Sequence, residues 1–365
     1  MSTDWTATHV AAIAGDMSVA PVIAPAHISS FTDAIDIWDA WPIQYRDGLP
    51  LELIDGTQLW MALAAPRSAN ADTRYDHARI HLLHLRADGW HDVGPAMPDD
   101  FSPGSREWSG SAIRDEADGA VILYFTAAGR RGENSLSSEQ RLFSARSDLT
   151  PAGLLTGWRD LTEILVSDPS HYMSTLMPGL AGSIKAFRDP AYFRDPMDGR
   201  NYLFFAGSAA HSPFAHNGAI GVATASATRP HDWLLLRPLI LADGVNNQLE
   251  RPHVVRYDGC YYLFWSTQHD GFNPEGPTGP TGLYGMTAPA LSGPWRPIND
   301  SGLVFADHAF ADSAQAQARN WLVLPDLRVV SFVDGSGDGD DDGTGNSFAP
   351  FLRLWLRGDK GGLEA

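Results

Sequence analysis

Three acidic residues lie in three separate and distinctive stretches of the chain: Asp39 in IWDAWP, Asp189 in FRDP and Glu250 in LERPH. Each is flanked by Trp, Arg or Pro, residue types that fix a carboxylate by packing and hydrogen bonding. Such a set suits retaining sugar chemistry, in which one carboxylate attacks the sugar and another transfers a proton. A third often steadies the sugar hydroxyls while positive charge develops. We therefore take these residues as the candidate catalytic groups.

Asp39 is one of two acidic residues in the stretch DIWDAWP. Asp36 and Asp39 are three residues apart, and residues at that spacing on a strand point to opposite faces. Only one of them can therefore face a site, and the neighbouring Trp38 and Trp41 favour Asp39 in a shaped apolar pocket. The alternative is that the aromatic rings belong to the core and that Asp39 is a turn residue.

The stretch FRDPAYFRDP contains the same word twice, around Asp189 and Asp195. Asp195 runs directly into Asp198 and Gly199, a pair typical of tight turns, so we assign Asp195 to the turn. Asp189 precedes the strand, and the adjacent Arg188 can hold its carboxylate in the ionised form. We interpret Asp189 as functional and Asp195 as structural.

Glu250, in NNQLERPHVV, is the candidate for proton transfer. A general acid has to be protonated near neutral pH, so burial or a nearby carboxylate must raise its pKa. Asp39 across the pocket would be such a carboxylate. His253 could bind substrate, although a histidine that follows proline on an apolar strand is more often a hydrogen-bonded core residue.

The stretch SREWSGSAI brings together groups suited to binding a sugar: Trp108 and Ser109 beside Arg106 and Glu107. An indole ring can form the apolar floor beneath a sugar, while Ser and Arg donate hydrogen bonds to its hydroxyls. The structural alternative is that an Arg–Glu pair holds the start of a strand here.

Five spaced turns must position these residues. Asp-Gly pairs precede β-rich apolar runs at residues 55–56, 118–119, 198–199 and 258–259, and Pro325-Asp326 precedes a fifth run. Asp-Gly flanked by apolar residues is a strong hairpin signal. Five long repeats favour a propeller over a jelly roll or sandwich, so we predict an all-β fold, a single five-bladed β-propeller with a central funnel-shaped active site. Helical periodicity is weak, and the stretch from Ser138 to Arg146 is the one candidate helix.

The ends of the chain and one loop are assigned separately. We expect residues 1–26 to wrap the outside of the fold and residues 27–365 to form the propeller. The first residues lack a basic region followed by an apolar run, so they do not form a standard signal peptide. The acidic loop 338–345 superficially resembles a calcium loop but lacks the closing bidentate Glu, so we expect a solvated hairpin tip.

Composition argues against several other classes of function. A net charge of -18 argues against binding nucleic acid or an anionic membrane. Cys260 is the only cysteine, which excludes an internal disulfide and a four-thiolate zinc site. The histidines show no metal-binding spacing, and the chain has neither a glycine-rich phosphate loop nor a GxSxG elbow. We therefore expect neither a metal nor a cofactor, and we infer no protein partner.

Taken together and in this order, IWDAWP, SREWSGS, FRDP and GVNNQLERPH resemble the bacterial levansucrase and inulosucrase family, glycoside hydrolase family sixty-eight. The likeness covers nearly the whole chain and is nearest to Gram-negative levansucrases and bacterial β-fructofuranosidases. Members are five-bladed propellers that split sucrose and transfer its fructosyl unit. The resemblance implies that Asp39 is the nucleophile, Glu250 the general acid/base and Asp189 the transition-state stabiliser. It also implies that the sugar subsites are lined by Trp38, Trp108, Ser109, Arg188 and Arg251.

The chain departs from the family pattern on the acceptor side of the site. Where many Gram-negative members have a histidine after FTIS, this chain reads FWSTQH, so the matching residue is Gln268 or His269. Arg319 replaces a family tyrosine, and Gln248 replaces an acidic residue of the calcium site found in some Gram-positive members. These departures bear on polymer synthesis and leave sucrose cleavage intact.

The resemblance implies a retaining fructosyltransferase that cleaves sucrose through a covalent fructosyl-enzyme and transfers fructose to sucrose, fructan or water. One alternative is a β-fructofuranosidase that mainly hydrolyses sucrose and forms short oligosaccharides. Another is a non-catalytic sugar-binding propeller, although such a module needs no paired acids. We expect an extracellular location because fructan synthesis draws on external sucrose; the missing signal peptide leaves a cytoplasmic location as the alternative.

Overall fold

The computed structural model describes residues 2–13, 15, 17–23, 34–67, 71–176, 184–226, 228–308, 317–334 and 347–364. These residues form β-strands with little helix, so the prediction of an all-β fold is confirmed. The helices are α1 (Ala7–Ala11), η2 (Ala71–His77), η3 (His269–Gly271) and η4 (Ile298–Asp300). None of the helices in this part of the chain is long and apolar enough to cross a membrane. The acidic loop 338–345 lies outside the described residues.

The largest sheet consists of two antiparallel meanders of four strands each. The first contains β2 (Ile35–Gln44), β3 (Gln58–Pro66), β4 (Arg79–Arg86) and β5 (Gly89–Pro95). The second contains β6 (Arg106–Arg114), β7 (Val121–Ala128), β8 (Gln140–Leu149) and β9 (Leu155–Leu165). Parallel pairing of β2 with β6, at Ile43–Ala112 and Gln44–Ile113, joins the two meanders.

Three further sheets follow in chain order. One holds β10 (Phe187–Arg194), β11 (Asn201–Ser208), β12 (Gly218–Ser226), β13 (Arg229–Leu235), β14 (Ile240–Leu241) and the N-terminal β1 (Thr3–Asp4). The next holds β15 (Glu250–Tyr257), β16 (Cys260–Thr267), β17 (Gly282–Ala288), β18 (Arg296–Pro297) and β19 (Leu303–Ala306). The last holds β20 (Gln317–Val323), β21 (Arg328–Asp334), β22 (Ser347–Phe348), β23 (Leu352–Arg357) and β24 (Lys360–Leu363).

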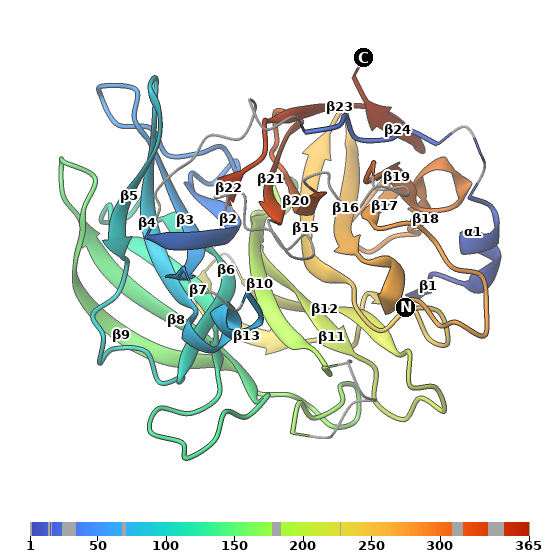
Figure 1. Ribbon diagram of the computed structural model, residues 1–365, viewed down its shortest axis with the longest axis horizontal. Helices are drawn as coiled ribbons and strands as arrows, with labels where there is room; N and C mark the ends of the chain where they lie inside the picture. Colours follow the sequence, from blue (N-terminus) through green and yellow to red (C-terminus); the bar gives the residue numbers. More distant parts are fainter. Residues whose placement is uncertain are drawn as a thin grey trace.

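Five strands meet in the middle of the molecule and are here called the inner strands: β2, β6, β10, β15 and β20. Each contacts the next, and β20 contacts β2, so the contacts close into a ring. Figure 1 shows these strands at the centre, with β5 and β9 at one side and β18 at the other. Three of the inner strands, β10, β15 and β20, lie at the edge of their sheets, and β2 and β6 lie where the two meanders of the largest sheet meet.

The five predicted turns each precede a strand, and each of these strands pairs with an inner strand. Gly56, Gly119, Gly199 and Gly259 have φ of 83°, 77°, 71° and 80°, a region that glycine enters without steric cost. In the fifth turn Leu327 takes this conformation, with φ of 66°. The turn prediction is confirmed at all five places.

The helix predicted at residues 138–146 is wrong. Residues 140–149 form β8, which hydrogen-bonds to β7 on one side and to β9 on the other. Pairing with two neighbours satisfies the backbone along the strand, and tertiary context of this kind overrides a weak local helical preference.

The N-terminal residues are anchored by Trp5, which is 1% exposed. Its ring packs edge-on against Trp265 and Tyr284, with both centroids 5.3 Å away, and its Nε1 donates to the carbonyl of Ser301 at 2.9 Å. Strand β1 extends the sheet of β10–β14 through β14. The described residues up to 23 therefore pack against the sheets that contain β14 and β19.

Candidate active site

Each inner strand pairs with the strand that follows it in the sequence, and this pairing is interrupted by a register shift at one point. The shifts fall between Trp38 and Trp41, Trp108 and Gly110, Arg188 and Ala191, Glu250 and His253, and Arg319 and Leu322. A bulge of this kind bends the strand and re-aims a side chain, and bulges are common next to active sites. The candidate residues of the sequence analysis lie at or beside these interruptions.

Four residues at these bulges adopt positive φ although none is glycine. Asp39, Asp189, Arg251 and Asn320 have φ of 51°, 61°, 48° and 52°. Residues other than glycine rarely enter this region, and each such residue costs about 1–3 kcal/mol unless its surroundings hold it there. These four strained residues lie at the bulges of four inner strands, so we take the region of the bulges as a functional site.

The bulges surround a cavity of about 300 Å³. It is lined by nine of the predicted site residues: Trp38, Asp39, Trp108, Ser109, Arg188, Asp189, Glu250, Arg251 and Gln268. The lining also includes Leu63, Tyr75, Ile184, Gln248 and Asn320. All three candidate carboxylates, from β2, β10 and β15, therefore face one space.

Asp39 is held by neighbours from three other inner strands. Ser109 donates its hydroxyl to Oδ2 at 2.6 Å, and Asn320 donates Nδ2 to Oδ1 at 2.8 Å. Arg251 lies 3.8 Å from the same Oδ1 and is itself fixed by the carbonyls of Ala40 and Asn320, at 2.6 and 2.9 Å. Two donated hydrogen bonds and a nearby guanidinium hold this carboxylate in one orientation.

Arg188 connects the other two acids. Its Nη2 donates to Glu250 Oε1 at 3.0 Å, while its Nε lies 3.6 Å from Asp189 Oδ2. The backbone N–H of Asp189 donates to Thr126 Oγ1 at 2.9 Å, and that hydroxyl donates to the carbonyl of Ser109 at 3.1 Å. Thr126 thus fixes the bulge of β10 against that of β6.

Burial controls the protonation of these acids. It raises the pKa of Asp189 to about 7, an effect opposed by Arg188 and reinforced by Asp39 and Glu250. Burial also raises the pKa of Glu250, with Arg188 again opposing and Asp39 reinforcing. Three carboxylates beside two guanidinium groups carry a net charge of -1 when all are ionised, so one bound proton makes the cluster neutral. The site is therefore built to hold a proton near neutral pH.

Aromatic and polar side chains complete the walls. The rings of Trp38 and Tyr75 meet edge-on at 5.6 Å, and Trp108 carries the guanidinium of Arg106 over its ring at 5.7 Å. Gln268 accepts a hydrogen bond from Arg319 Nη1 at 2.8 Å. The aromatic rings can pack against the face of a sugar, and the amide of Gln268 can hydrogen-bond to hydroxyls at its edge.

His269 does not line the cavity, in contrast to Gln268. Its Nδ1 lies 2.8 Å from the carbonyl of Gly279, and its backbone N–H donates to Thr281 at 3.0 Å. Of the two alternatives left open by the sequence, the geometry therefore favours Gln268 as the residue facing the substrate.

The residues assigned to structural roles lie away from the cavity. Asp36 pairs with Arg67 at 3.4 Å, and Asp195 accepts the hydroxyl of Tyr261 at 2.6 Å and the N–H of Met197 at 2.9 Å. Both ring nitrogens of His253 have backbone partners, and burial lowers its pKa to about 4. Its position in the core agrees with the sequence interpretation.

Asn320 is the main site residue that the sequence analysis missed. It occupies the bulge of β20 and donates directly to Asp39. Its stretch, ARNWLVLP, resembles none of the other four motifs. Counting back from the fifth turn, at Pro325-Asp326, would have placed it on the fifth inner strand.

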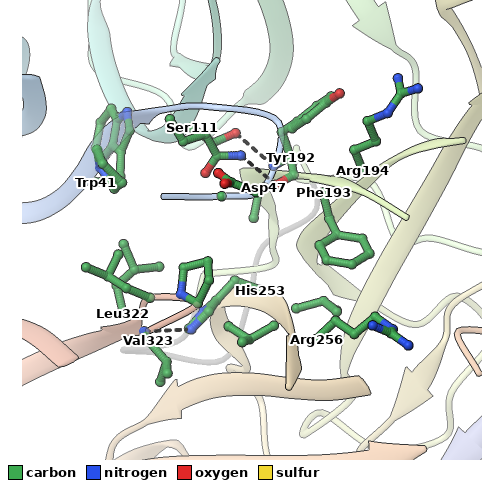
Figure 2. A pocket seen from close by; sticks show the side chains of 18 of the residues that line it. Trp41, Asp47, Ser111, Tyr192, Phe193, Arg194, His253, Arg256, Leu322 and Val323 are labelled. Atoms are coloured by element: carbon green, nitrogen blue, oxygen red, sulfur yellow. Dashed lines mark hydrogen bonds between the residues drawn. The ribbon is translucent and has the colours of Figure 1, made fainter. Parts of the chain in front are cut away.

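A second cavity, of about 410 Å³, lies further along the same inner strands. Figure 2 shows Trp41, Ser111, Tyr192, His253 and Val323 around it, one residue from each inner strand. Its described lining is largely apolar and includes one carboxylate, Asp47. Of these two cavities, the first therefore offers the paired acids.

Comparison with known proteins agrees with this geometry. The profile of the Levansucrase/Invertase family matches residues 1–218 and 212–364. A levansucrase of Rahnella aquatilis is 30% identical over 390 residues, covering 96% of this chain and 91% of its own. A levansucrase of Pseudomonas savastanoi pv. glycinea is 30% identical over 389 residues, covering 94% and 86%.

Solved structures give the same result. The inulosucrase of Halalkalicoccus jeotgali, solved with kestose bound, superposes with a TM-score of 0.87 at 31% identity, covering 100% of this chain and 95% of that one. Bacillus subtilis levansucrase shares the fold with a TM-score of 0.85 at 20% identity, covering 100% and 95%. The chain belongs to the levansucrase/invertase family, glycoside hydrolase family 68.

Proposed function

We propose that this protein is a retaining fructosyltransferase that cleaves sucrose, releases glucose and transfers fructose to sucrose, fructan or water. The observation that carries the proposal is the convergence of Asp39, Asp189 and Glu250 on one cavity, with Arg188 and Arg251 between them. Family membership and the levansucrase and inulosucrase relatives support the choice of substrate.

In the first step Asp39 attacks the anomeric C2 of the fructosyl unit. Its two hydrogen bonds, from Ser109 and Asn320, hold the carboxylate in one orientation at the wall of the cavity. Glu250 protonates the departing glucosyl oxygen at the same time, a role that its raised pKa supports. The bond between C2 and the glucosyl oxygen breaks, and a covalent fructosyl-enzyme forms.

Asp189 stabilises the transition state through hydrogen bonds with fructosyl hydroxyls, which strengthen as positive charge develops at C2. When the single proton resides on Glu250, Arg188 and the backbone N–H of Arg251, 3.4 Å from Oδ2, favour the ionised form of Asp189. The three carboxyl groups and the two guanidinium groups are then neutral as a set before the reaction. The reaction adds no net charge to this set.

In the second step Glu250 acts as a base and removes the proton from the acceptor hydroxyl, which attacks C2 and frees Asp39. Two displacements at C2 give overall retention. This mechanism predicts that the carboxyl groups of Asp39 and Glu250 lie roughly 5 Å apart. The reaction requires no cofactor.

We propose that the fold is a single five-bladed propeller, formed by residues 27–365, with the active site as a funnel at one end of its axis. The closed ring of inner strands and the division of the largest sheet into two meanders support this arrangement. Four sheets, one of them double, then correspond to five blades.

The test is incubation with sucrose, with free glucose and free fructose measured separately. Glucose in excess of fructose is expected for a transferase, and equal amounts would make the enzyme a β-fructofuranosidase. Absence of glucose, with sucrose bound and uncleaved in calorimetry, would identify a non-catalytic sugar-binding protein and overturn the proposal.

A further inference from the structure

Lys185 precedes β10 and is buried, with 4% of its surface exposed. Its Nζ donates to three oxygens: the carbonyl of Ala215, Asn217 Oδ1 at 2.6 Å and Asn247 Oδ1 at 2.8 Å. An ammonium group has three N–H donors, and all three find an acceptor here. A neutral amine has two donors, so this arrangement selects the charged form although burial lowers the pKa of Lys185.

The three acceptors are carbonyl oxygens, and none of them is a carboxylate. A cation surrounded by neutral oxygens is solvated much as it would be in water, and it ties together the segments that supply those oxygens. Lysine is rare in this chain: only Lys185 and Lys360 occur among 26 lysines and arginines. Lys360 lies at the surface and pairs with Asp300 at 2.6 Å.

Asn247 belongs to the loop 245–249, which leads directly into Glu250. Its backbone N–H donates to the carbonyl of Gly271 at 2.8 Å, and the carbonyl of Asn246 accepts the N–H of Gly218 at 2.8 Å. A Cβ at Gly218 would lie 2.8 Å from that carbonyl oxygen, so glycine allows the loop to approach β12 this closely. Lys185 adds a side-chain contact that also fixes Asn247.

Two parallel cross-links therefore join the same pair of segments. Lys185 binds Asn247, and three residues further along both segments Arg188 binds Glu250. Arg188 contacts the reacting carboxyl group of Glu250, whereas Lys185 holds the loop that leads to Glu250. Gln248, between the two links, lines the cavity.

We infer that Lys185 is a positioning residue for Glu250: its ammonium is a built-in cation that locks the loop 245–249 and so keeps Glu250 buried and aligned for proton transfer. The inference rests on the proposed function for the role of Glu250. The mechanical part, the locking of the loop, is independent of any substrate.

The test compares Lys185→Met with Lys360→Met, the matched variant at the other lysine. Lys185→Met is expected to lower kcat for glucose release by about tenfold to a hundredfold, because small displacements of reacting groups are costly. KM for sucrose should stay within about threefold. A looser loop admits water to Glu250, so the alkaline limb of the pH–rate profile should move down by at least about half a pH unit. Lys360→Met should change none of these.

Hydrogen exchange provides a readout without substrate. In Lys185→Met the peptide covering residues 245–251 should exchange faster than in the wild type, with the inner strands β2 and β6 unchanged. If Lys185→Met does not fold, Asn247→Ala removes the loop side of the same contact and should give the same shifts. When both fold, their effects on kcat should not add in the double variant.

A folded Lys185→Met with kcat within about twofold of the wild type, the same alkaline limb and unchanged exchange would overturn the inference. For Asn247→Ala the same three results would do so. Wild-type protein that releases no glucose would instead defeat the proposed function. The exchange measurement separates these two failures.

Discussion

Asp39 and Asp189 adopt the same left-handed backbone conformation at bulges of two inner strands, with φ of 51° and 61°. Both side chains enter the cavity from these positions, and both are less than a tenth exposed. A regular strand would alternate its side chains between the two faces and could not direct them in this way. The strained backbone at these two bulges therefore goes together with the placement of both acids in one cavity, as expected where strain serves a functional site.

Asn320 tests this coupling, because it combines a φ of 52° with a hydrogen bond to Asp39. Asn320→Gly relieves the strain and removes the donor, so we expect unchanged or higher thermal stability with kcat at least about tenfold lower. Asp160→Gly is the control, since exposed Asp160 has φ of 55° on β9. It should gain stability without losing activity. An Asn320→Gly variant with wild-type kcat would show that the donor to Asp39 is dispensable.

The acid assignments are tested by Asp39→Asn and Glu250→Gln. Each should reduce glucose release by at least about a hundredfold, because a lost nucleophile or general acid removes that much rate, while circular dichroism remains native. The repeated word FRDP offers the matched comparison. Asp189→Asn should be strongly impaired, and Asp195→Asn nearly normal, because Asn keeps the oxygen that accepts from Tyr261 and Met197. A collapse of activity in Asp195→Asn alone would reverse the assignment.

The raised pKa values of Asp189 and Glu250 also predict how stability depends on pH. A carboxyl group whose pKa is higher in the folded than in the unfolded state binds more protons when folded, so its contribution to stability falls as pH rises. For Asp189 the window runs from its ordinary value near 4 to about 7. Asp189→Asn should therefore gain Tm relative to the wild type between pH 5 and pH 8, by roughly 1–4 °C.

Scanning calorimetry of both proteins at the two pH values decides this point. A Tm difference that becomes more negative at pH 8 would mean that the ionised carboxylate stabilises the fold. Arg188, 3.6 Å from Asp189, would then outweigh burial.

The turns and the three acids could be predicted because each is encoded locally. Asp-Gly sets a positive φ within the turn itself, and Asp39, Asp189 and Glu250 each lie in a distinctive word. The bulges could not be predicted from the sequence in the same way, because the extra residue is recognised only by comparison with the partner strand. Strand β8 was missed for a related reason: pairing with β7 and β9 decides its structure.

Asn320 and Lys185 escaped the sequence analysis because their partners are distant along the chain. The donor and acceptor of the Asn320–Asp39 bond are separated by 281 residues, and Lys185 binds oxygens 30, 32 and 62 residues away. Lys185 lies two residues before the word FRDP and Asn320 directly after Arg319, but neither stretch identifies these distant partners. Contacts of this type follow from the closed ring of inner strands, which local patterns do not specify.

Gln268 is expected to control the fate of the fructosyl group. It lines the cavity and is fixed by Arg319, whereas its neighbour His269 is bonded to Gly279 outside the lining. Gln268→Ala should change the ratio of transfer to hydrolysis more than it changes total sucrose consumption. This ratio is the amount of free glucose minus free fructose, divided by the amount of free fructose. The reason is that a missing amide alters how an acceptor hydroxyl competes with water, and it leaves the three acids in place. His269→Ala is the control and should keep the wild-type ratio. A ratio unchanged in Gln268→Ala, or shifted more by His269→Ala, would show that the acceptor is held elsewhere.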